Sequence, residues 1–114
     1  MDRKLPVKTK QIDLDGDYQG WWFKIYTNPP SGALIDSVEA LEKVGKEAKL
    51  SIIMPPIFSF LQLVILEWNF VDGKGRELPI SIDSFKKFPI ELILNLTLKT
   101  QEALIALPLV SKPN

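Results

Sequence analysis

The sequence contains no cysteine and no histidine, and its charges cancel, with 14 basic and 14 acidic residues in a chain of 114. Without these two residue types the chain has no disulfide, no thiolate nucleophile and no imidazole for acid–base catalysis near neutral pH. Zinc sites of the usual ligand types are excluded for the same reason. A net charge of zero also removes the attraction on which sequence-independent binding to nucleic acid depends. The composition therefore argues against an enzyme, a metal or other cofactor, and a nucleic-acid partner.

The chain also lacks an apolar stretch long enough to cross a membrane. Residues 50–66 carry no charge, but they fall short of the roughly 20 apolar residues that span a bilayer, and Pro55 and Pro56 interrupt them. We interpret this segment as part of the core. The basic N-terminus is followed by acidic residues rather than by an apolar segment, which is not the pattern of a secretory signal. We therefore expect neither a membrane partner nor export.

Apolar residues are nevertheless abundant. Leucine, isoleucine, valine and phenylalanine supply 40 of the 114 residues, well above the level at which chains remain disordered. A chain of this length can bury about two-thirds of its surface. We expect residues 1–114 to form a single domain around one core.

Two pairs of alternating segments predict β-hairpins. Residues 7–14 and 21–26 alternate apolar and polar side chains, and the Asp-Gly-Asp cluster at residues 15–17 is typical of the turn between them. The second half of residues 61–71 alternates in the same way, and residues 76–80 follow it after a glycine-rich turn. The pattern predicts a small antiparallel sheet.

Two other segments have the spacing of helices. Residues 33–48 place an apolar stripe on one face of a predicted amphipathic helix. The stripe consists of Leu34, Val38, Leu41 and Ala48. A long C-terminal helix is predicted to begin near Pro89, which is tolerated in a first helical turn, and to end at Pro108. Together the patterns predict an α+β fold, with hairpins, one amphipathic helix and one long C-terminal helix.

The C-terminal helix is apolar around more of its circumference than one sheet can cover. Its polar residues form a narrow band, which leaves an apolar arc of roughly 240°, compared with about 100° on an ordinary surface helix. One flank of this arc carries Ile90, Leu94, Leu98 and Ile105. The other flank carries Leu92, Leu96, Ala103 and Leu107.

The apolar side chains of this second flank must pack against another segment to be shielded from water, and the sequence allows two such segments. Residues 52–63 of the same chain are apolar enough to pack there. Alternatively the flank contacts another subunit or a partner helix, because soluble monomers rarely expose apolar patches of more than a few hundred Å². On the second reading, the candidate partner-binding residues are Leu92, Leu96, Ala103 and Leu107.

A calcium-like spacing occurs near the N-terminus. Asp13, Asp15 and Asp17 match the first three ligand positions of a calcium loop. Such a loop also needs glycine at its sixth position and glutamate at its twelfth, where this chain has Tyr18 and Lys24. We interpret the cluster as a solvated turn, and we assign no metal-binding or catalytic residues.

Residues 66–79, LEWNFVDGKGRELP, combine an apolar strand, Trp-Asn, an apolar pair, Asp-Gly, a short polar run and Leu-Pro. A short segment follows at residues 81–88, and Pro89 then opens the terminal helix with Pro-Ile-Glu-Leu. Upstream, a Gly-Trp-Trp strand precedes Pro29 and Pro30. Over much of the chain this order resembles the siphophage tail assembly chaperones.

The resemblance implies a small α+β protein that acts in the cytoplasm of an infected bacterial host during tail morphogenesis. It implies a homo-oligomer that coats the hydrophobic tape measure protein until tail tube subunits replace it, with no catalytic residues and no cofactor. Two alternatives remain open. One is a structural tail or neck subunit of the virion. The other is a small-molecule binding module that uses Trp21, Trp22 and Tyr26, although aromatic residues of this kind more often pack in a core.

Overall fold

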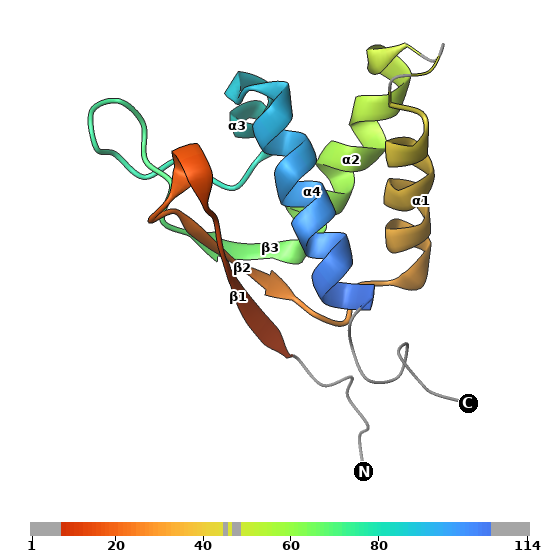
Figure 1. Ribbon diagram of the computed structural model, residues 1–114, viewed down its shortest axis with the longest axis horizontal. Coiled ribbons are helices and arrows are strands. Elements are labelled where there is room, and N and C mark those ends of the chain that lie inside the picture. Colours follow the sequence, from red (N-terminus) through yellow and green to blue (C-terminus); the bar gives the residue numbers. More distant parts are fainter. Residues whose placement is uncertain (1–7, 45, 47–48, 106–114) are drawn as a thin grey trace.

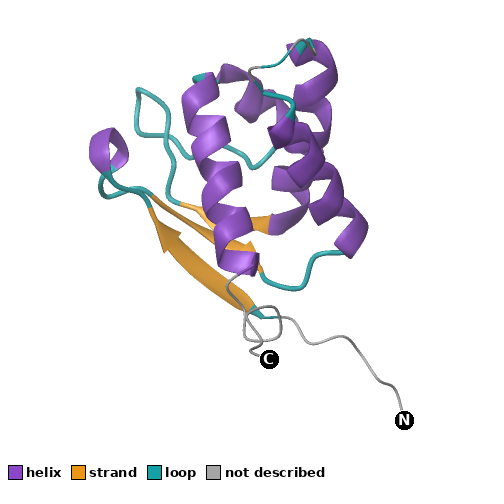
Figure 2. Ribbon diagram, turned by 45° about the vertical axis from the view of Figure 1, so that its right-hand side comes forward, coloured by secondary structure: helices purple, strands orange, loops and turns teal. Residues whose placement is uncertain are grey.

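A three-stranded antiparallel sheet and a layer of helices make up the computed structural model, which describes residues 8–44, 46 and 49–105. In chain order the elements are β1 (Thr9–Asp13), the 3-10 turn η1 (Gly16–Tyr18), β2 (Trp22–Tyr26), α1 (Ser31–Glu42), α2 (Leu50–Val64), β3 (Ile65–Trp68), α3 (Ile82–Lys87) and α4 (Ile90–Ile105). The helices cover one face of the sheet (Figure 1; Figure 2). The α+β class and the antiparallel sheet predicted from the sequence are confirmed. Within the described ranges, no helix combines the length and the apolar character needed to span a membrane.

Strand β2 lies at the centre of the sheet, between β1 and β3. Its side chains alternate as the sequence predicts, because successive residues of a strand point to opposite faces. Phe23 and Ile25 are fully buried under the helices. Trp22, Lys24 and Tyr26 occupy the opposite face and are half-buried. This alternation gives the sheet one apolar face, on which the helices pack.

The chain that follows β3 is held by hydrogen bonds of residues in the segment 66–79. Trp68 donates its indole N–H to the carbonyl of Leu78 at 2.8 Å. The side-chain oxygen of Asn69 accepts a hydrogen bond from the backbone N–H of Trp22, also at 2.8 Å. Asp72 accepts two backbone N–H bonds from the turn that follows it. These conspicuous residues of the pattern therefore serve the local structure of this chain.

Helix α2 continues through Pro55 and Pro56, where the sequence pattern predicts an interruption, so that prediction is wrong. Each proline in a helix interior costs about 3 kcal/mol. The helix compensates with a row of buried side chains, which are Ile53, Ile57, Phe60, Leu61 and Val64. Burying each of them contributes about 1.5–3 kcal/mol, so the row outweighs the two prolines. The interpretation of this segment as core is confirmed for that row.

Helices α1 and α3 also differ from the predicted pattern. Helix α1 ends at Glu42, before the end of the predicted segment, and its most deeply buried residues are Ser37 and Ala40. The predicted stripe is only half-buried where it is described, and Ala48 lies outside the described residues. The short helix α3 is not expected from the sequence. It begins at Ile82, and the hydroxyl of the preceding Ser81 caps it by accepting the N–H of Ser84 at 3.3 Å.

Candidate functional site

Helix α4 is covered on two sides, by the sheet and by the pair of helices α1 and α2 (Figure 1). Leu92 is 1% exposed and Leu96 is 0% exposed, so both lie in the core of their own chain. Ala103 is half-buried, and Leu107 lies outside the described residues. The expectation that Leu92 and Leu96 are accessible to a partner is therefore wrong. The intrachain alternative holds for them, because α2 supplies the second cover.

Polar contacts fix the position of α4 in this arrangement. The side-chain amide of Gln101 donates to the hydroxyl of Ser37 on α1 at 3.0 Å, and both residues are buried. At the start of α4, the hydroxyl of Tyr18 donates to the Glu91 carboxylate at 3.5 Å. Burial and the nearby Glu91 carboxylate raise the pKa of Tyr18 above its ordinary value of 10.0. Helix α4 is thus tied to α1 and to the η1 turn.

The calcium-like aspartates lie in and around the η1 turn. Asp13, Asp15 and Asp17 are exposed. The carboxylate of Asp15 lies 3.8 Å from the ammonium group of Lys99 on α4. Within the part of the chain that the structure describes, no group of three acidic side chains could hold a metal ion. Asp15 therefore makes a further surface contact between the turn and α4.

The three aromatic residues of the small-molecule alternative do not gather on one surface. Trp21 packs against Tyr18 and Phe70, with ring centroids 5.0 Å and 4.9 Å apart. Trp22 and Tyr26 lie on the opposite face of β2, away from the helices. The structure therefore separates Trp21 from the other two, which removes the three-ring site that the sequence suggests.

Exposed apolar side chains are concentrated on the helices. The large ones among the described residues are Ile35, Leu50, Ile52, Leu63, Leu66, Val71, Ile90, Leu98 and Ile105. Three of them belong to α4, on the flank opposite to Leu92 and Leu96. The excess of apolar surface predicted for this helix is therefore present, but on its other flank.

A groove runs between helices α1 and α2, which lie antiparallel (Figure 1). At one end, a cavity of about 250 Å³ is lined by residues that include Lys43 and Ile52. At the other end, a cavity of about 350 Å³ is lined by residues that include Ala33 and Leu63. The residues that line both cavities are Asp36 and Pro56. The two cavities adjoin at these residues, and together they are here called the α1/α2 groove.

Each helix contributes one regularly spaced row of side chains to the α1/α2 groove. The row from α2 is Ile52, Pro56, Ser59 and Leu63, and the row from α1 is Ala33, Asp36, Ala40 and Lys43. Spacings of three and four residues place side chains along one face of a helix, and helices pack side by side with this spacing. The α2 row extends over about 16 Å at 1.5 Å per residue. The groove is therefore long enough to bind about three turns of another helix.

Sequence patterns alone do not reveal this groove. The spacing of Ile52, Pro56, Ser59 and Leu63 is visible in the sequence. It becomes informative only when α2 is known to continue through its prolines. The α1 row is less conspicuous still, because it mixes alanines with charged residues.

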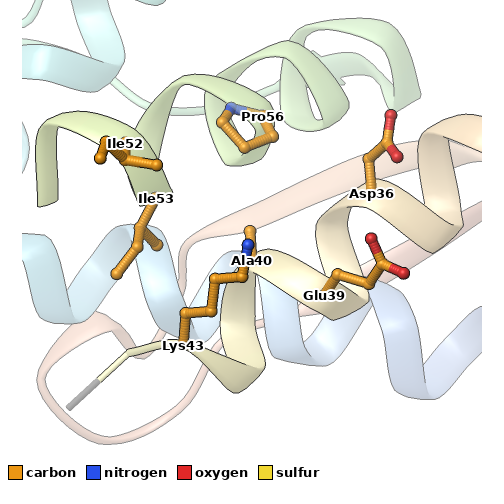
Figure 3. A pocket seen from close by; sticks show the side chains of 7 residues that line it. All are labelled: Asp36, Glu39, Ala40, Lys43, Ile52, Ile53 and Pro56. Carbon is orange, nitrogen blue, oxygen red and sulfur yellow. The ribbon is translucent and has the colours of Figure 1, made fainter. Parts of the chain in front are cut away.

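Charged side chains lie along the α1 wall of the groove. Figure 3 shows Asp36 and Glu39 next to each other, with Lys43 one turn further along α1. None of the three makes an ion pair with any residue that the structure describes. Two carboxylates three residues apart on a helix repel each other. On the α2 wall Ile52 is 61% exposed. The groove thus combines an apolar wall with a wall of net negative charge.

A second groove lies on the other side of α2, between α2 and α3. It has a volume of about 440 Å³ and is lined mainly by apolar residues. These include Leu50, Met54, Phe58 and Ile82, with Lys86 as the charged residue. Helix α2 therefore separates two apolar grooves, one with acidic residues on its rim and one with a lysine.

Comparison with known proteins adds no family to this description. No model of a protein family matches the chain, and searches of curated proteins and of solved structures give no match either.

Proposed function

We propose that this protein is a chaperone of phage tail assembly that holds an apolar helix of the tape measure protein in its α1/α2 groove. The observation that carries the proposal is the pair of three-and-four-spaced rows that line this groove. An amphipathic helix that enters such a groove buries its apolar face between the two walls. The protein would act in the cytoplasm of the infected bacterium, where tails are assembled.

A groove of this kind meets two requirements of a chaperone, which are exposed apolar surface and a stable fold. A protein that covers an apolar client must expose apolar surface before the client arrives, and must remain folded while it does so. Here the exposed residues Ile52 and Leu63 belong to a helix whose opposite side is fully buried. The buried side stabilises the fold, so the exposed side is available for contact with a client.

Self-association is the second part of the proposal, and we assign it to the outer flank of α4. This flank exposes Leu98 and Ile105, with Glu91 and Glu102 also exposed on the helix. The groove between α2 and α3 is apolar and has Lys86 on its rim. Opposite charges around two apolar surfaces favour contact between them. Copies of the chain would then associate head to tail.

In the virion-subunit alternative, the protein binds its partners through the same surfaces but stays bound to them in the mature virion. Mass spectrometry of purified particles distinguishes the two functions, because a chaperone is absent from the mature virion and a tail or neck subunit is present. The small-molecule alternative loses support from the structure, since Trp21 lies apart from Trp22 and Tyr26.

Co-expression with the tape measure protein tests the proposal. We expect the wild-type chain to retain the tape measure protein in a pull-down. The double variant Ile52→Asp/Leu63→Asp should lose it, because two charges replace the apolar contacts of the groove. Circular dichroism should show that this variant is folded, since substitutions of exposed residues usually change stability by no more than about 0.5 kcal/mol.

A matched control is available on β3. Leu66 is 46% exposed, close to the 44% of Leu63, but it lies outside the groove. The variant Leu66→Asp should retain the tape measure protein like the wild type. Equal retention by the double groove variant would contradict the proposal.

A further inference from the structure

Strand β1 lies at the border of the sheet, and half of its backbone groups point away from β2. Within the described residues β1 pairs with one strand only, which is β2 (Figure 1). The register of this pair is continuous, and the backbone N–H of Leu14 bonds to the carbonyl of Trp21. In an antiparallel pair, residues that exchange such bonds alternate with residues that do not. Three residues of β1 therefore direct their N–H and C=O groups outward, and they are Thr9, Gln11 and Asp13.

These outward groups, here called the β1 edge, are open to another strand. Thr9, Gln11 and Asp13 are all exposed. An unpaired row of N–H and C=O groups is a template for a further strand, and proteins commonly block such edges with proline or a bulge. β1 contains no proline, and its pairing with β2 has no shift of register. Neither device blocks the β1 edge.

The helix side of the β1 edge has room for the side chains of an added strand. A cavity of about 290 Å³ lies between β1 and α4 and is lined by residues that include Lys10, Ile12 and Glu102. A lysine on the covered face of an edge strand usually hinders pairing, because the added strand would bury its charge. Here Lys10 borders a cavity that Glu102 also lines. The lysine therefore keeps an acidic neighbour when another strand is added.

The charges along β1 indicate which strand fits the edge. Positive charge lies at the start of the strand, on Lys8 and Lys10, and negative charge lies at its end, on Asp13 and Asp15. Antiparallel pairing with an identical strand brings the basic start of one copy next to the acidic end of the other, and complementary charges favour such a contact. We propose that a second copy of the chain adds its own β1 to this edge, so that the two three-stranded sheets join into one continuous sheet.

The register that pairs every outward group has a two-fold axis at Gln11. Thr9 of each copy then lies opposite Asp13 of the other copy, and Gln11 lies opposite its own counterpart. The residues of each such pair exchange two backbone hydrogen bonds, because all three direct their N–H and C=O groups to the same edge. The contact is isologous and closes at two copies. It uses neither the α1/α2 groove nor the exposed flank of α4, so it does not depend on the proposed function.

Light scattering of variants tests the pairing. Leu98→Lys removes the head-to-tail contact proposed for α4, and we expect this chain to have twice the mass of a monomer. Adding Gln11→Pro should give a monomer, because proline has no N–H to donate across the edge. The N–H of Gln11 points away from β2, so each copy keeps its own ladder. Adding Gln11→Ala instead is the matched control, since it shortens the side chain but keeps the N–H, and this chain should remain a dimer.

Single cysteines test the register, because the chain has no cysteine of its own. Gln11→Cys places two cysteines opposite each other at the axis, with Cα atoms about 5.5 Å apart, which a disulfide can span. Thr9→Cys is the control on the same face of the strand. Its two cysteines are four residues apart along the strands, which is about 13 Å and too far for a disulfide. Mild oxidation should therefore link copies of Gln11→Cys but not copies of Thr9→Cys.

The outcomes separate this inference from the proposed function. A Leu98→Lys chain that is folded by circular dichroism but monomeric would overturn the β1 pairing, and so would a dimer that survives Gln11→Pro. Equal cross-linking of the two cysteine variants would overturn it as well. If Gln11→Pro unfolds the chain, the cysteine variants decide. Retention of the tape measure protein by the wild-type chain tests the α1/α2 groove independently of these results.

Discussion

The two flanks of helix α4 have similar residues and opposite environments. Leu92 and Leu96 on one flank are buried, whereas Leu98 and Ile105 on the other are 50% and 51% exposed. The difference comes from their neighbours, because the sheet and the α1–α2 pair cover the first flank, whereas Leu98 and Ile105 on the second are left half exposed. An apolar residue on a helix is therefore not by itself evidence of either a core or a contact surface.

The largest expected effect tests the buried flank. Leu96→Ala should lower the free energy of unfolding by about 2–5 kcal/mol, because it removes apolar contacts and leaves a cavity. This loss is a large part of the stability of a small domain, which is typically about 5–15 kcal/mol. Urea denaturation followed by circular dichroism measures it.

The matched control for this variant lies two residues away on the other flank. Leu98→Ala should change the free energy of unfolding by no more than about 0.5 kcal/mol, because the residue is half exposed. Light scattering of Leu98→Lys should show a smaller assembly than the wild type if this flank mediates self-association. Equal stabilities of the two alanine variants would contradict the distinction between the flanks.

A smaller effect tests the hydrogen bond between Gln101 on α4 and Ser37 on α1. Ser37→Ala leaves the buried amide of Gln101 without its hydrogen-bond acceptor at 3.0 Å. An unsatisfied buried polar group costs about 1–3 kcal/mol, so stability should fall by that amount. The double variant Ser37→Ala/Gln101→Met should recover most of the loss, because both polar partners are then apolar. No recovery would mean that packing around Ser37, and not the hydrogen bond, fixes α4.

The smallest effect is expected outside both flanks, at Asp72. Backbone N–H bonds from Arg76 and Lys74 hold the pKa of this carboxyl below its ordinary value of 3.8. A lowered pKa in the folded state means that the charged form stabilises the fold above pH 3.8, and that this stabilisation is lost as the pH falls through the lowered pKa. At neutral pH, Asp72→Asn should therefore melt slightly below the wild type, and by less than Ser37→Ala.

Thermal melts across a pH series check the cause of this effect. The difference between Asp72→Asn and the wild type should disappear in strong acid, where the wild-type carboxyl is also protonated. A difference that persists at all pH values would show that the side-chain amide disturbs the turn by its shape rather than by its lack of charge.

Much of the sheet could be predicted from the sequence. The alternation through Phe23 and Ile25 has a period that only a strand satisfies, and the aspartate–glycine turns end each segment locally. The predicted return strand over residues 76–80 is reduced to a single bridge between Val71 and Glu77 in the described residues. Local propensity therefore predicts where the chain turns better than how far its strands pair.

The helices are harder to predict because their extent and burial depend on packing against segments that are distant in the sequence. Pro55 and Pro56 predict an interruption when only local energies are considered. Helix α2 persists because its buried row packs against other elements, and this gain is not visible in a local pattern. The α1/α2 groove was missed for the same reason, since it exists only where two helices meet.

The sequence by itself determined the class of fold, the position of the turns, and a C-terminal helix with more apolar surface than one sheet can cover, because period and turn chemistry are local properties of the chain. Only the tertiary structure decided that Leu92 and Leu96 are enclosed, while Ile52 and Leu63 remain at the surface. Burial depends on which segments come together in space, and residues far apart in the chain compete to cover the same apolar surface.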